Sequence, residues 1–160
     1  MTGGAVRALA PSRGDRGRAA ADARGAGAGD RCGPGAAARA VAARLVSGHV
    51  VAVDRSARAV AQAEAGSARE IASGRMSVRC VAAEDFVRVP GEGPFDLVFA
   101  VRVGALDGRH PEAGRRVLER VAVALAPGGR LFVDGVDGVD RGDPLREISV
   151  PPGPPAEPGG

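Results

Sequence analysis

The segment from Cys32 to Asp54, CGPGAAARAVAARLVSGHVVAVD, decides the fold of this chain. It contains a Gly-x-Gly turn at Gly33 and Gly35, then a helical pattern, then a β-branched run that ends in an acidic residue. Such a turn lets the backbone approach a ligand closely and leaves the first N–H groups of the helix free to bind it. A carboxylate at the end of the next strand would bind a ribose hydroxyl. The segment therefore predicts a nucleotide-cofactor site.

Helices and strands alternate through this segment and beyond it. Apolar residues at helical spacing, with glycine or proline as stops, predict helices over residues 36–47, 56–73 and 111–125. Apolar and β-branched runs predict strands over residues 50–53, 76–81, 95–101 and 130–134. This alternation predicts an α/β fold with a parallel, right-handed sheet.

Three further segments follow the glycine turn in a specific order. They are Val81–Phe86 (VAAEDF), Gly93–Ala100 (GPFDLVFA) and Leu125–Asp134 (LAPGGRLFVD). With the turn, they make residues 30–135 resemble the class I (Rossmann-like) S-adenosylmethionine-dependent methyltransferases. The resemblance implies a Rossmann-like open sheet of mostly parallel strands with flanking helices, and S-adenosylmethionine as the cofactor.

The chain departs from the family pattern on both sides of this region. Residues 10–40 contain no Val, Ile, Leu, Met or Phe, so we expect a low-complexity, disordered arm and no first strand. Towards the carboxyl terminus only residues 145–150 have a strand pattern, so the family's terminal antiparallel hairpin is also doubtful. The expected organisation is an arm over residues 1–28, a methyltransferase-like cofactor-binding domain over residues 29–135 and an irregular Pro/Gly-rich tail over residues 136–160.

The resemblance implies a set of contacts at the glycine turn. The family's turn is acidic-x-Gly-x-Gly-x-Gly, and Gly33 and Gly35 match its last two glycines. Arg31 occupies the position of the first glycine, where its charge is unfavourable beside a sulfonium ion. The acidic position falls on Gly29, and Asp30, one residue away, is the candidate carboxylate. The alternative is a plain turn between two elements.

Three carboxylates follow predicted strands. Asp54 can accept two hydrogen bonds from the ribose diol, or it can instead cap the helix for which Ser56 is the expected N-cap. An acidic residue after the family's third strand contacts the adenine amino group. Glu84 matches that position and Asp85 is the near alternative, while either can also be a solvated loop charge.

The segment Ala100–His110 follows the fourth predicted strand, where ligands meet the carboxyl edge of an open sheet. His110 is the candidate general base that takes a proton from the acceptor. The alternative is a surface histidine beside Pro111 at a helix entrance. Methyl transfer needs no covalent intermediate, so the lack of a nucleophilic triad does not count against it.

Composition narrows the function classes. The 160 residues include four Phe and no Trp or Tyr, which disfavours base-stacking surfaces. The net charge of +3 comes from scattered arginines, so we expect no nucleic-acid partner. Cys32 and Cys80 match no metal-ligand spacing, so no metal site is expected. No segment has the length and apolarity of a signal peptide or a membrane span, which predicts a cytoplasmic protein.

The function expected is methyl transfer from S-adenosylmethionine to a small-molecule acceptor. One alternative is a nicotinamide-dinucleotide-binding oxidoreductase domain, because Gly33, Gly35, Ala38 and Asp54 also satisfy that fingerprint. The absence of a substrate domain and the Pro-Gly-Gly segment at Pro127 weigh against it. The other alternative is a truncated or degenerate methyltransferase-like domain without catalysis. The acceptor and the oligomeric state stay open.

Overall fold

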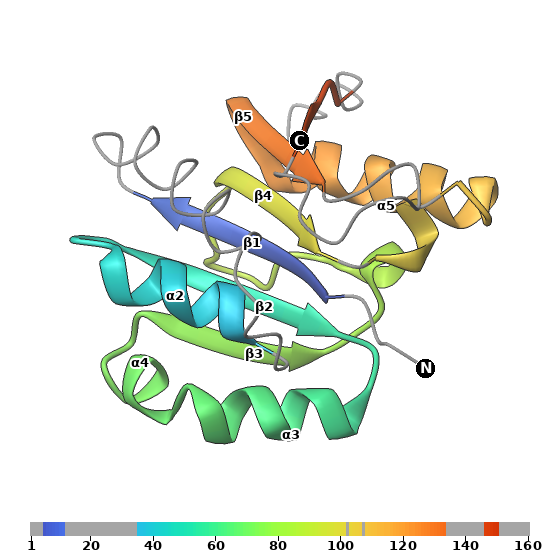
Figure 1. The fold of residues 1–160 in the computed structure, drawn as a ribbon. Coiled ribbons are helices and arrows are strands. Elements are labelled where there is room, and N and C mark those ends of the chain that lie inside the picture. Colours follow the sequence, from blue (N-terminus) through green and yellow to red (C-terminus); the bar gives the residue numbers. More distant parts are fainter. Residues whose placement is uncertain (1–4, 12–34, 102, 107, 134–145, 151–160) are drawn as a thin grey trace.

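Figure 1 shows the computed structural model of the chain, a twisted sheet with helices packed against it. The structure describes residues 5–11, 35–101, 103–106, 108–133 and 146–150. Within these residues the strand order is β3-β2-β1-β4-β5-β6. The strands are β1 (Ala5–Pro11), β2 (Gly48–Asp54), β3 (Met76–Cys80), β4 (Phe95–Val101), β5 (Leu125–Val133) and β6 (Arg146–Ile148). The helices are α2 (Ala36–Arg44), α3 (Ala57–Gly66), α4 (Ala68–Ala72) and α5 (Pro111–Ala124), with two 3₁₀ turns, η1 (Ala83–Asp85) and η2 (Gly104–Leu106).

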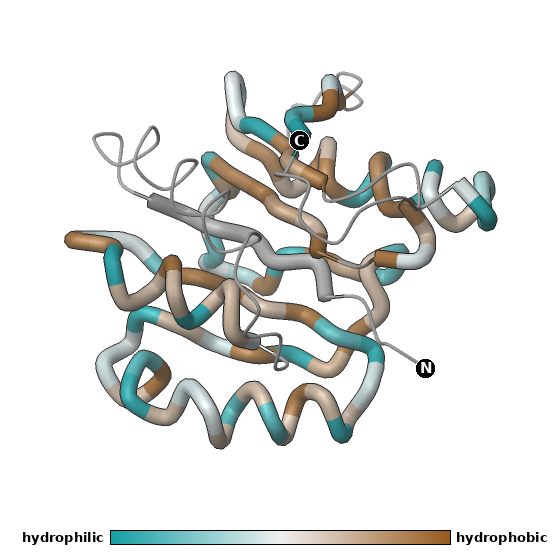
Figure 2. Tube along the Cα trace, in the orientation of Figure 1, coloured by the Kyte–Doolittle hydropathy of each residue, from teal (hydrophilic) through white to brown (hydrophobic). Residues whose placement is uncertain are grey.

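Alternate residues of the inner strands face the two helical layers. Val50 and Ala52 of β2 pack with Val41 of α2 in one buried cluster. Val51 and Val53 belong to a second buried cluster, which also holds the apolar stripe of α5, Val117, Val121 and Ala124. Apolar residues run continuously over residues 50–53 of β2 and 97–101 of β4 (Figure 2), the pattern of strands covered on both faces.

The amino-terminal segment corrects the expectation of a disordered arm with no first strand. Ala5–Pro11 forms β1, which lies between β2 and β4 and is antiparallel to both. Its Leu9 is opposite Val50 on one side and Leu97 on the other. A strand inside a sheet pairs its backbone along both edges, and the seven residues of β1 do so with β2 and β4. Residues 1–4 and 12–28 of the expected arm lie outside the described residues.

The other predicted elements are present with adjusted ends. The helix expected over residues 56–73 is divided at Ser67 into α3 and α4. β2 and β3 pair in parallel, as do β4 and β5, so the parallel α/β interpretation is confirmed for these strands. β5 begins at Leu125, earlier than predicted, and its register against β4 shifts between Phe95 and Leu97. The shift accommodates extra residues of β5 between Leu125 and Arg130, where Gly128 has a φ of +74°.

The expected irregular tail is also corrected in part, because Arg146–Ile148 forms β6. This strand pairs antiparallel with β5, and Arg130 forms a two-point ion pair with Glu147 across the two strands. The hydrogen bonds that Arg130 donates to the Glu147 carboxylate raise the pKa of the Arg130 guanidinium above its ordinary value. The remainder of the tail, residues 136–145 and 151–160, lies outside the described residues. None of the described helices has the length and apolarity required to cross a membrane.

Candidate functional site

The strands β2, β3 and β4 end at the same edge of the sheet. β2 and β3 are parallel, with Asp54 opposite Cys80 at their carboxyl ends. β4 has the same direction as β2, since both are antiparallel to β1. Ligands of open α/β sheets bind outside this carboxyl edge. The candidate residues that follow these strands in sequence therefore come after strand ends on the side of the molecule where a cofactor would bind.

Asp54 is buried at the carboxyl end of β2, with 7% of its surface exposed. Its Oδ1 accepts a hydrogen bond of 2.8 Å from the backbone N–H of Ser56. Ser56, as predicted, is the N-cap of α3, and its Oγ accepts from the N–H of Ala59 at 3.3 Å. Asp54 thus fixes the turn that leads into the helix, while Ser56 caps the helix itself. Within the described residues, Oδ2 of Asp54 has no hydrogen-bond partner.

Gly35 is buried at the N-terminus of α2 and has a φ of +81°, which favours glycine. A Cβ at this position would lie 2.8 Å from the Cβ of Ala63 in α3. Nearby, Arg39 of α2 donates to the carbonyl of Gly66 at 2.6 Å, which holds the two helices together. Gly35 therefore has a packing role that requires no ligand, and as the N-cap of α2 it has no side chain with which to cap the helix.

Three of the predicted turn residues cannot be compared with the structure. Asp30, Arg31 and Gly33 lie outside the described residues, so the cofactor contacts expected of Asp30 and Gly33 and the unfavourable charge expected of Arg31 stay predictions. The predicted role of Gly35 as a cofactor contact also stays a prediction beside its packing role.

Glu84 and Asp85 lie in η1, which follows β3. Asp85 is exposed and Glu84 is half-buried. The carbonyl oxygen of Glu84 accepts a hydrogen bond of 3.3 Å from Nε of Arg120 in α5. This contact attaches η1 to α5 and fixes the position from which the Glu84 side chain extends. The two carboxylates therefore differ in their surroundings, although they are adjacent in sequence.

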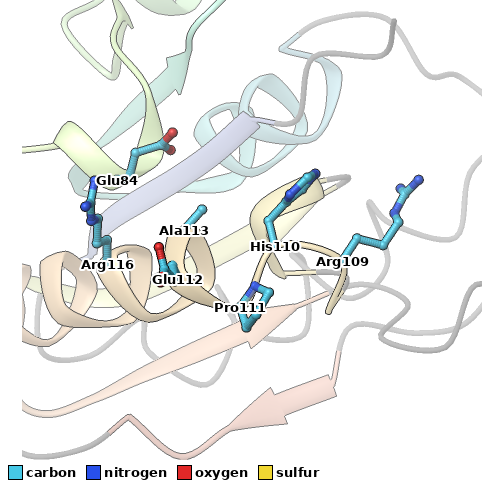
Figure 3. Close-up of a pocket in the computed structure, with 7 residues that line it drawn as sticks. All are labelled: Glu84, Arg109, His110, Pro111, Glu112, Ala113 and Arg116. Atoms are coloured by element: carbon cyan, nitrogen blue, oxygen red, sulfur yellow. The ribbon is translucent and has the colours of Figure 1, made fainter.

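A pocket of about 530 Å³ lies between η1 and the start of α5 (Figure 3). Its described lining residues are Glu84, Arg109, His110, Pro111, Glu112, Ala113 and Arg116. His110 is exposed, and its carbonyl accepts the N–H of Gly114 at 2.9 Å in the first turn of α5. The structure thus brings His110 and Glu84 to one pocket, whereas Asp54 and Asp85 are not among its described lining residues.

Three charged residues of this pocket were not predicted from the sequence, namely Arg109, Glu112 and Arg116. Glu112 and Arg116 are four residues apart in α5, a spacing that places them on one helical face. The apolar stripe of α5 includes the buried Val117 and Val121. Helical periodicity could therefore have placed Glu112 and Arg116 together on the polar face of α5. Within the described residues, no cluster of His, Cys, Asp and Glu is arranged to hold a metal ion.

Comparison with protein families identifies the class. Residues 31–129, more than half of the chain, match a family described as a methyltransferase domain. The chain belongs to this family of methyltransferase domains. The match confirms the resemblance to the class I S-adenosylmethionine-dependent methyltransferases, and with it S-adenosylmethionine as the cofactor of the class. No curated protein matches the sequence.

Solved structures support the same fold. The N-methyltransferase NodS from Bradyrhizobium japonicum has a TM-score of 0.54 at 20% identity, over 76% of this chain and 66% of that one. A NodS structure in complex with S-adenosyl-L-homocysteine has a TM-score of 0.53 at 20% identity, over 76% of this chain and 60% of that one. The [4+2]-cyclase SpnF has a TM-score of 0.51 at 26% identity, over 64% of this chain and 35% of that one.

The chain spans only part of the length of these relatives. It covers 66% of NodS and 35% of SpnF. The Rossmann-like α/β prediction is confirmed by the shared fold. Since SpnF is described as a cyclase, the fold by itself does not fix the reaction.

Proposed function

We propose that this chain binds S-adenosylmethionine at the carboxyl edge of its sheet and transfers the methyl group to a small-molecule acceptor. The observation that carries the proposal is Asp54. Its buried carboxylate ends β2, with Oδ1 held by Ser56 and Oδ2 without a hydrogen-bond partner in the described part of the chain. A carboxylate with this placement suits a ribose diol, and the family match supplies the class of cofactor.

The chain's residues fit the cofactor at several points. Asp54 would accept the ribose hydroxyls, and the first N–H groups of α2, whose N-cap Gly35 offers no capping side chain, would face the ligand. The resemblance assigns the adenine amino group to Glu84 or Asp85. It assigns Asp30, Gly33 and Gly35 to the turn around the cofactor. These residue roles are part of the proposal.

S-adenosylmethionine supplies an activated methyl group, which forms a bond to the acceptor while the carbon–sulfur bond breaks and its electron pair returns to sulfur. The acceptor atom loses its proton as its new bond forms. His110, exposed in the pocket beside α5, would take that proton. Imidazole suits this role because it ordinarily exchanges a proton near neutral pH.

The proposal is tested by calorimetric titration of the full chain with S-adenosylmethionine, S-adenosylhomocysteine and NAD. We expect binding of the two sulfur compounds and none of NAD. Binding of NAD alone would support an oxidoreductase domain, and a folded chain that binds none of the three would support a degenerate domain. Incubation of a binding-competent chain with candidate acceptors, followed by mass spectrometry for an added methyl group, tests transfer itself. The absence of a nucleic-acid partner and the cytoplasmic location stay predictions.

A further inference from the structure

The pocket between η1 and α5 has a charged lining that points to the chemistry of its ligand. Five of its described lining residues carry titratable side chains: Glu84, Arg109, His110, Glu112 and Arg116. The other two are Pro111 and Ala113, so none of the described lining residues is Phe, Tyr, Trp or a large aliphatic residue. Apolar ligands are usually held by aromatic and aliphatic walls. This lining therefore favours a small, charged ligand.

The charges of the pocket are not all paired with one another. Elsewhere in the described residues, Arg79 pairs with Glu92 and Arg130 pairs with Glu147. By contrast, three charged side chains of the pocket have no hydrogen-bond or ion-pair partner within the described part of the chain: Glu84, Glu112 and Arg116. Glu112 and Arg116 are one helical turn apart, a spacing at which such pairs commonly form. Two carboxylates and a guanidinium are thus left facing one space.

The elements that carry the pocket residues are attached to one another and to their neighbours. The hydrogen bond from Arg120 to the carbonyl of Glu84 attaches η1 to α5. In addition, η2 and α5 are in close contact, because a Cβ at Gly114 would lie 2.6 Å from the carbonyl oxygen of Ala105. A site whose charged groups extend from fixed elements loses less freedom when it binds. Figure 3 shows Glu84 on η1 and the other side chains on or just before α5.

We propose that this pocket binds a small zwitterion of the amino-acid type, and that this zwitterion is the methyl acceptor. Its ammonium group would contact Glu84 and Glu112, and its carboxylate would contact Arg116. Of the two residues that the resemblance offers for the adenine amino group, Asp85 is then the one left for the cofactor. A ligand with only a negative charge would be repelled by the two carboxylates, and one with only a positive charge would leave Arg116 without a partner. The role as acceptor rests on the proposed function, whereas binding of the zwitterion does not.

The test begins with binding to the full chain, followed by NMR of the backbone amides. The probes are the standard L-amino acids at millimolar concentration, and then the amine and the carboxylic acid that correspond to the best binder. We expect the zwitterion to shift the amides around Glu84 and residues 110–116. Each singly charged analogue should bind about fivefold to tenfold more weakly, because one exposed charge contact is lost.

Charge-neutralising variants locate the site. Glu84→Gln and Arg116→Gln should each weaken binding of the zwitterion by about fivefold. Glu119→Gln and Arg115→Gln are the matched controls, since both are exposed positions of α5 outside the pocket lining. These controls should leave the affinity unchanged. Circular dichroism of all four variants checks that the fold is retained.

Two results would overturn this assignment. One is that no amino acid binds, and the other is that the pocket variants and the controls behave alike. S-adenosylhomocysteine is titrated separately into the same samples. If the zwitterion binds at the pocket and the cofactor product does not bind anywhere, the proposed function fails while the zwitterion site stands. If the cofactor product binds and no zwitterion does, the zwitterion site fails while cofactor binding stands.

Discussion

At the scale of single residues, Gly35 has a packing role that can be tested without a ligand. Replacement by Ala would impose a strained positive φ and bring the new Cβ to 2.8 Å from Ala63. We expect Gly35→Ala to lower the free energy of unfolding by about 2–4 kcal/mol, the sum of backbone strain and overpacking. Gly74→Ala is the control, because Gly74 has a φ of +72° but a Cβ added there would have no atom of the described residues within 4 Å. It should cost about 1 kcal/mol in urea denaturation.

The double variant Gly35→Ala with Ala63→Gly isolates the close approach of the two helices. Removing the Ala63 methyl relieves the contact, so the double variant should recover part of the stability lost by Gly35→Ala. If the two changes are simply additive, the contact with α3 is not the reason for the glycine.

Asp54 carries the second prediction at this scale. Asp54→Asn keeps an oxygen that can accept the Ser56 N–H but removes the charge offered to the ribose. We expect affinity for S-adenosylhomocysteine to fall by about 1.5–3 kcal/mol with little change in stability. Ser56→Ala is the control, because it removes the cap on Ala59 while leaving Asp54 intact. Unchanged affinity in a folded Asp54→Asn chain would restrict Asp54 to its role in the turn.

At the scale of elements, the junction of α3 and α4 contains a buried hydroxyl without a partner. Ser67 is 0% exposed, and its Oγ makes no hydrogen bond in the described part of the chain. Because a buried hydroxyl without a partner is unfavourable, Ser67→Ala should leave stability unchanged or raise it by up to about 1 kcal/mol. Ser56→Ala should lower it by about 1 kcal/mol, since that serine does cap its helix. Thermal unfolding of both variants checks the contrast, and equal losses would contradict it.

The same junction shows what periodicity predicts and what it misses. The pattern of apolar residues correctly predicted helix on both sides of Ser67, but it gave no sign of the break, because the apolar spacing continues from Val60 to Ile71. The buried strands β2 and β4 were predicted well, since strands covered on both faces are apolar at nearly every position. Local patterns therefore identified the strands that are covered on both faces.

At the scale of the whole molecule, the tertiary context determined what the sequence left undecided. The carboxylate at the end of β2 was predictable because strand direction alone places it at the sheet edge. Helical periodicity could have placed Glu112 and Arg116 on the polar face of α5, but not at a pocket, because the pocket depends on η1 lying beside α5. The strand β1 was missed because its sequence, AVRALAP, has few large apolar residues and lacks the usual signal of a central strand.

The position of β1 gives the last prediction. Ala8 is opposite Val51 of β2 and Val98 of β4, so its backbone lies in the interior of the sheet with a paired strand on each side. Ala8→Pro removes that N–H and should destabilise the chain by about 3 kcal/mol or more, because proline is excluded from the middle of a sheet. Ala5→Pro is the control, since Ala5 is the first residue of β1 and has a partner only in β4, Val101. A strand start tolerates proline, so this variant should lose much less stability in urea denaturation. Equal stability of the two variants would mean that Ala5–Pro11 does not join β2 to β4, and that the centre of the sheet is filled in another way.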